Sequence, residues 1–269
     1  MAWGYLGAFF VVSAIGCAIG FKKPVYFLSV GYGLSVGLLG ITYLVTILAG
    51  GLSWNAVTVI QCFLLMAYGA RLAGFLIARE MKNQNYRKVL EDVRKADSNG
   101  KPVPFGGKLA IWIGAAVLYI MQTCPIFFRA YNGLGQDVVL PAVGAAISLA
   151  GLLIETLADK QKSEQKRKNP DMVAMEGLFR MVRCPNYFGE VLFWTGVFVG
   201  GLNALQGIGQ WVMAVLGFVI ILMVMVNGAQ RLDKRQEARY GDQPIYRAYA
   251  DHTPILLPLL PIYHIGRYR

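Results

Sequence analysis

The sequence predicts an all-α polytopic membrane protein with seven transmembrane helices, an outside N-terminus and a cytoplasmic C-terminus. Hydrophobic residues make up 56% of the 269 residues, and charged residues only 15%. Apolar runs long enough to cross a bilayer recur along the chain. Basic residues gather in alternate connections between these runs. Because lipid offers the backbone no hydrogen-bond partners, the runs must be helices.

The first three predicted helices are almost free of charge. Met1–Phe21 is uncharged and lacks the basic start and cleavage site of a signal peptide, so we expect it to be retained. Pro24–Ala70 is also uncharged and is long enough for two helices joined by a turn at Gly50–Asn55. We expect residues 1–78 to form the apolar, substrate-side wall of a single membrane domain, residues 1–269.

Four more helices are predicted from the later apolar runs. They are Leu109–Phe128, Val138–Ile154 and the two halves of Val191–Gln230, which we expect to break near Gly200–Gly209. We expect residues 107–269, with helices four to seven and the cytoplasmic loops, to bind a cofactor.

Charge placement predicts the orientation. Lys and Arg number 26 against 15 Asp and Glu, and they concentrate at Lys22-Lys23, at residues 79–108 and 159–183, and in the tail after Gln230. Positive loops stay in the cytoplasm, so the basic excess needs no nucleic-acid partner. We expect a bacterial inner membrane, with membrane lipids as partners and an active site open to the cytoplasm.

The sequence offers no pattern typical of a metal site. The four cysteines are far apart, and both histidines lie in the C-terminal tail. We therefore expect no bound metal and no disulfide framework.

Glu190 is the clearest candidate for chemistry, because ionisable groups inside membrane helices are costly to bury. It follows Asn186 by one helical turn, so the two share a face near the cytoplasmic end of the sixth predicted helix. Such a pair suits an amide, a ribose or an amine. The alternative is a helix-end glutamate bonded to a neighbouring arginine.

A polar stripe continues from the fifth predicted helix. Its acidic members accept hydrogen bonds from ribose hydroxyls, and its basic members suit phosphate oxygens. The alternative is a solvated helix face. The stripe comprises Glu155, Asp159, Lys162 and Lys166, followed by Arg167 and Lys168.

Tyr68, Arg71, Phe75 and Arg79 fall on one face of the third predicted helix. A buried phenol such as that of Tyr68 can donate to a carbonyl oxygen and stabilise negative charge developing there. The alternatives are a packing tyrosine and arginines that extend to the inner interface.

Residues 180–190, RMVRCPNYFGE, resemble the RHPNYFGE signature of the steroid 5-alpha-reductase-like membrane oxidoreductases. Ala158–Lys162 resembles the aDxQK element of that family, and Leu232–Pro258 is similar to its C-terminal pattern. Pro254–Pro261 is too short and proline-rich to span, so we expect it on the inner membrane surface or folded back as a lid. Cys184 replaces the signature histidine.

The resemblance implies an NADPH-dependent reductase of a carbon–carbon double bond in a hydrophobic, steroid- or lipid-like enone. Tyr68 and Glu190 are the implied catalytic residues, with Tyr68 polarising the substrate carbonyl. Asn186 and Glu190 are implied beside the nicotinamide. The other implied cofactor ligands are Arg79, Asp159, Lys162, Lys166, Arg183, Tyr187, Asp233, Tyr246 and Tyr249.

Two questions stay open at the level of sequence. Steroid 5-alpha-reductases pair the tyrosine with a glutamate in span two, which this chain lacks; Tyr32, Tyr43 and Gln61 are the alternatives. The function has two alternatives as well: an S-adenosylmethionine-dependent membrane methyltransferase of the isoprenylcysteine carboxyl type, and a non-catalytic lipid-binding membrane protein.

Overall fold

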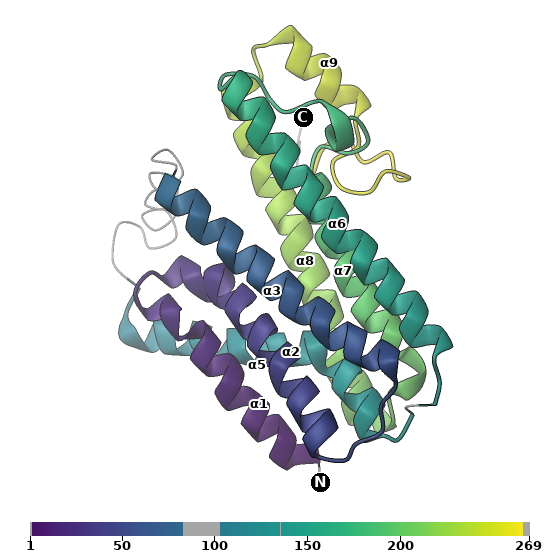
Figure 1. Cartoon of the computed structure of the whole chain (residues 1–269). Helices are drawn as coiled ribbons and strands as arrows, with labels where there is room; N and C mark the ends of the chain where they lie inside the picture. Colours follow the sequence, from purple (N-terminus) through teal and green to yellow (C-terminus); the bar gives the residue numbers. More distant parts are fainter. Residues whose placement is uncertain (1, 83–102, 135, 266–269) are drawn as a thin grey trace. The chain divides into compact units, whose positions relative to one another are not determined.

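The computed structural model of the chain describes residues 2–82, 103–134 and 136–265. All regular secondary structure in these ranges is helical, which confirms the predicted all-α class (Figure 1). The α-helices are α1 Ala2–Cys17, α2 Val30–Ala49, α3 Ala56–Lys82, α5 Phe105–Tyr131, α6 Val139–Lys168, α7 Pro185–Gly201, α8 Gly207–Tyr240 and α9 Pro244–His252. Short 3-10 helices cover Ala18–Phe21, Pro24–Leu28, Gly177–Arg180 and Leu202–Ala204.

Six segments of the described chain are long and apolar enough to cross a membrane, so the protein is an integral membrane protein. The predicted sixth span is α7, which has 17 residues and is not among the six. The count of seven spans and the orientation of the termini therefore stay predictions. The six segments are Gly4–Phe21, Pro24–Ala49, Ala56–Lys82, Phe105–Tyr131, Val139–Lys168 and Gly207–Tyr240.

The helix ends agree with the predicted turns in most places. The connection between α2 and α3 falls at residues 50–55, and the break in the last apolar run falls between Gly201 and Gly207. Gly207 has a φ of +70°, a backbone conformation that residues with a Cβ rarely adopt. The predicted basic loop at 79–108 lies largely outside the described residues.

The chain divides into two compact units. Unit 1 contains residues 1–145 and 197–217, and unit 2 contains residues 146–196 and 218–269. The expectation of a single membrane domain stays a prediction.

Unit 1 is held together by small residues where α2 and α3 meet. A Cβ on Gly69 would lie 2.4 Å from the Gly33 carbonyl oxygen and 2.7 Å from the Gly37 Cα. Only glycine permits such backbone contact, as expected for helices that pack in lipid without a hydrophobic driving force.

Unit 2 uses the same device between α6 and α7. A Cβ on Gly189 would lie 2.7 Å from both the Glu155 amide nitrogen and the Gly151 carbonyl oxygen. The two helix backbones therefore touch one residue before Glu190.

Candidate functional site

The beginning of α7 carries Asn186 and Glu190, two polar side chains of the RMVRCPNYFGE segment. Pro185 is the first residue of the helix, a position where its missing N–H leaves no bond unmade. Glu190 is buried, with 7% of its surface exposed. In the described part of the chain, the Oδ1 atom of Asn186 is buried and accepts no hydrogen bond. A buried acceptor in this state indicates that a donor from a ligand or solvent belongs there.

Glu155 is a second buried carboxyl group in unit 2, with 3% of its surface exposed. It comes from α6 at the place where the backbone of that helix contacts Gly189. The close approach of α6 and α7 therefore brings Glu155 and Glu190, predicted separately, to neighbouring positions along the two helices.

Arg183 and Asp233 form a buried ion pair, with the Nη1 and Oδ1 atoms 2.8 Å apart. The Nη2 atom of Arg183 donates to the Tyr263 carbonyl oxygen, and Asp233 accepts from the Ile265 amide at 3.3 Å. Both predicted cofactor ligands are thus engaged by the C-terminal segment.

The segment after Thr253 folds back onto unit 2. The Arg183 and Cys184 amides donate to the carbonyl oxygens of Pro254 and Ile255 at 2.8 and 2.9 Å. Ile255 also packs in an apolar cluster with Cys184 and Ala229. Of the two sequence expectations for this segment, the contacts match the folded-back arrangement.

The polar stripe lies on a continuous helix, because α6 extends to Lys168. Asp159 and Lys162 are half-buried. Lys166 donates to the Met172 carbonyl and to the Tyr240 hydroxyl, so its ammonium group already has internal partners.

Two glutamines of α6, Gln161 and Gln165, hold the following loop, a role that the sequence reasoning missed. The Gln161 Oε1 atom accepts from the Leu178 amide at 2.9 Å, and Gln165 Oε1 accepts from the Glu176 amide at 3.0 Å. Gly177 has a φ of +66°, and a Cβ there would lie 2.5 Å from Gln161. The signal in the sequence that could have indicated this contact is the combination of a glutamine at position 161 with a glycine at position 177.

The predicted tyrosines lie in the packed part of unit 2. Tyr246 is fully buried beside Tyr240 and Val173. The Tyr249 hydroxyl donates to the Phe179 carbonyl oxygen at 2.7 Å, and burial raises the pKa of Tyr249. Tyr187 packs against Gly228, where a Cβ would lie 3.2 Å from the Tyr187 ring.

Tyr68 lies in unit 1 and is fully buried. Its hydroxyl donates to the Tyr32 hydroxyl at 3.0 Å. Of the other proposed partners, Tyr43 hydrogen-bonds to Thr123 and Gln61 donates to the Pro141 carbonyl oxygen. Tyr32, one of the three alternatives, therefore contacts Tyr68.

Arg79, the other candidate in unit 1, is exposed near the end of α3.

A sequence profile described as "Protein of unknown function (DUF1295)" matches residues 20–253. The chain belongs to this family. The match includes Tyr32 and Tyr68 in unit 1 as well as Asn186 and Glu190 in unit 2. No curated protein and no solved structure matches the chain.

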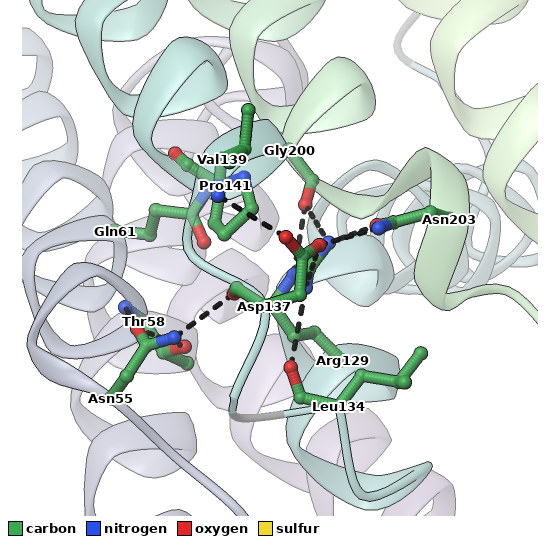
Figure 2. A network of polar contacts seen from close by, with 10 residues as sticks. All are labelled: Asn55, Thr58, Gln61, Arg129, Leu134, Asp137, Val139, Pro141, Gly200 and Asn203. Atoms are coloured by element: carbon green, nitrogen blue, oxygen red, sulfur yellow. Dashed lines mark hydrogen bonds and ion pairs between the residues drawn. The ribbon is translucent and has the colours of Figure 1, made fainter.

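This DUF1295 family member also contains a polar network in unit 1 that the sequence reasoning did not single out (Figure 2). Arg129 is fully buried, and its Nε and Nη2 atoms donate to the Gly200 carbonyl oxygen at 3.0 and 2.8 Å. Its Nη1 atom lies 3.2 Å from Asp137, which also accepts from Asn203. The only signal was that Arg129 and Asp137 are the two charges between the fourth and fifth predicted spans.

The network ties the end of α7 to the connection after α5. Gly200 lies in the last turn of α7, whose terminal carbonyls have no partners within the helix. A guanidinium is well suited to cap such carbonyls, because it presents several donors in a fixed plane. Asn55 joins from the start of α3 by donating to the Asp137 carbonyl oxygen at 3.1 Å.

Proposed function

We propose that this protein is an NADPH-dependent reductase of a carbon–carbon double bond in a hydrophobic enone, of the steroid 5-alpha-reductase-like type. The observation that carries the proposal is the start of α7, where Asn186 leaves a buried acceptor open one turn before the buried Glu190. This is also the segment that resembles the RHPNYFGE signature.

The residues at this position fit the nicotinamide end of the cofactor. Leaving a buried acceptor without a donor costs about 1–3 kcal/mol, so Asn186 favours a ligand with an amide N–H. When bound, reduced nicotinamide supplies a hydride. In the proposal, Asn186 orients the carboxamide and Glu190 accepts a second hydrogen bond beside it.

The polar stripe on α6 supports binding of the rest of the cofactor. Asp159 suits the ribose hydroxyls, and Lys162, Arg167 and Lys168 suit phosphate oxygens, including a 2′-phosphate. Lys166 and Arg183 already have internal partners, so in the proposal they act mainly by holding the walls of the site.

On the substrate side, the proposed role of Tyr68 is to donate a hydrogen bond from its hydroxyl to the carbonyl oxygen of the enone. Withdrawing charge toward that oxygen makes the β-carbon a better hydride acceptor. The enolate left by hydride addition then takes a proton from solvent at its α-carbon, which completes the reduction of the double bond. The apolar helices α1, α2, α3 and α5 suit a substrate that enters from lipid.

The proposal is tested by adding NADPH, S-adenosylmethionine or neither to detergent-purified protein and measuring the midpoint of thermal unfolding. We expect stabilisation by NADPH, and weaker stabilisation in Asn186→Ala and Glu190→Gln. Stabilisation by S-adenosylmethionine alone would instead establish the methyltransferase alternative. No response to either ligand would favour the lipid-binding alternative.

Matched controls are available in the same unit. Asn169 and Glu164 are exposed, so Asn169→Ala and Glu164→Gln should leave the NADPH response unchanged. Turnover is then followed as NADPH oxidation with a lipophilic enone, and Tyr68→Phe should lower it without weakening cofactor binding.

A further inference from the structure

Unit 1 contains a pair of buried phenols, Tyr32 and Tyr68, that are hydrogen-bonded to each other. The Tyr68 hydroxyl donates to the Tyr32 hydroxyl at 3.0 Å, and the two side chains are 0% and 6% exposed. Their rings meet edge to face, with centroids 5.8 Å apart. In an apolar interior, a hydrogen bond of this kind holds the two hydroxyl oxygens close to each other.

Tyr32 is itself held on a rigid support. Its ring stacks on the ring of Tyr119, with centroids 4.8 Å apart and planes 25° from parallel. Tyr119 is anchored in turn, because its hydroxyl donates to the Phe27 carbonyl oxygen at 2.8 Å. The Tyr32 hydroxyl therefore has little freedom to move away from Tyr68.

We infer that Tyr32 is a positioning residue. It holds the Tyr68 hydroxyl in place to donate one hydrogen bond to the oxygen of an uncharged ketone. The inference rests on the proposed function and deepens it. Without a ligand, Tyr68 donates to Tyr32. When a ketone is bound, the hydroxyl hydrogens rotate, so that Tyr68 donates to the ketone and Tyr32 donates to the Tyr68 oxygen.

This rearrangement moves only hydrogen atoms, so the heavy atoms can stay where the stacked rings hold them. A hydrogen bond received by the Tyr68 oxygen polarises its O–H bond and strengthens the bond that it donates. Two phenols bring no positive charge to the ligand, which suits a neutral ketone better than a carboxylate.

The binding test uses a cyclohex-2-enone carrying a ten-carbon alkyl chain, added to the full-length protein in detergent. Hydrogen bonding to an enone carbonyl shifts the π–π* absorption band of the enone to longer wavelength. Measuring this shift requires neither turnover nor cofactor. We expect a red shift with the unchanged protein, a smaller shift in Tyr32→Phe and none in Tyr68→Phe. Tyr32→Phe retains the ring that stacks on Tyr119.

The kinetic test separates positioning from structure. In Tyr32→Phe we expect kcat for enone reduction to fall about tenfold, the effect of one hydrogen bond felt in the transition state, with KM unchanged. In a Tyr68→Phe background, the same substitution should cause no further loss, because Tyr32 acts through Tyr68. If Tyr32 had only a structural role, Tyr32→Phe would lower kcat by the same factor in both backgrounds.

Tyr43→Phe is the matched control. Tyr43 lies on the same helix and is fully buried, and its hydroxyl bonds to Thr123 at 2.7 Å rather than to Tyr68. It should leave the enone shift and kcat unchanged.

The outcomes distinguish the role of Tyr32 from the proposed function. An unchanged protein that reduces the enone, together with a Tyr32→Phe variant equal to it in shift and kcat, overturns the role of Tyr32 alone. A protein that neither shifts nor reduces the enone overturns the proposed function and this inference together.

Discussion

Arg183 Nη1 and Asp233 Oδ1 lie 2.8 Å apart in a buried pair that joins the chain just before α7 to the last third of α8. The side chains are 0% and 7% exposed. The pair also receives the C-terminal segment through Tyr263 and Ile265. A cofactor phosphate that used Arg183 would therefore compete with contacts inside the protein.

Asp233→Asn should strongly destabilise unit 2. Removing one partner of a buried ion pair leaves the other charge uncompensated, at a cost of about 3–5 kcal/mol. Thermal unfolding in detergent measures the effect. Arg239→Gln is the control, since its pair with Asp171 is exposed and spans 3.4 Å. Equal unfolding midpoints for the two variants would show that the Arg183–Asp233 pair does not contribute to the stability of unit 2.

The helices were predictable because their signal is long and redundant. An uncharged run such as Pro24–Ala49 can only be a helix in lipid, and the Gly50–Asn55 turn follows from its glycines and polar residues. The end of α6 was harder to place, because helix continues through the charged residues to Lys168. There the charges mark where solvent begins, and they do not end the helix.

The candidate site was predictable only in part. Asn186 and Glu190 could be placed on one face because they are local neighbours in a helix. The contact of Tyr68 with Tyr32 joins residues on different helices, and sequence reasoning left three partners open. Arg129 shows the same limit, since its partner Gly200 has no side chain to mark it. Backbone acceptors leave no trace in a single sequence.

Gly189→Ala should destabilise the contact between α6 and α7 and weaken the proposed binding of NADPH. The new Cβ would meet the Glu155 amide nitrogen and the Gly151 carbonyl oxygen at 2.7 Å, and backbone atoms cannot give way as a flexible side chain can. Gly74→Ala is the control on α3, where nothing lies within 4 Å of the added carbon. We expect Gly74→Ala to be neutral or to stabilise by up to about 1 kcal/mol. A Gly189→Ala protein with unchanged unfolding and NADPH binding would contradict the close approach.

Cys184 should resist maleimide in the native protein at pH 8. Burial raises its pKa to about 12, which keeps the thiol protonated and unreactive, because the thiolate is the nucleophile. Alkylation followed by peptide mass spectrometry reads out this site. Ser163→Cys supplies an exposed thiol for comparison. Rapid labelling of Cys184 before unfolding would show that the fold of residues 254–265 over it is wrong.

Unit 1 should become less stable in acid, because protonation removes the charge of Asp137. The hydrogen bond from Asn203, followed by smaller contributions that include the charge of Arg129, holds the pKa of Asp137 below its ordinary value of 3.8. A lowered folded-state pKa stabilises the native state above pH 3.8, and this stabilisation is lost as pH falls from there through the folded-state pKa. Asp137→Asn should therefore lower the unfolding midpoint at pH 6, and the difference from the unchanged protein should shrink toward pH 3. Asp171→Asn, at an exposed side chain, should show no such convergence. A gap between Asp137→Asn and the unchanged protein that stays constant from pH 6 to pH 3 would mean that the Asp137 charge does not stabilise the network. Arg129 would then be held by its uncharged acceptors, the Gly200 and Leu134 carbonyl oxygens and the Asn203 side chain.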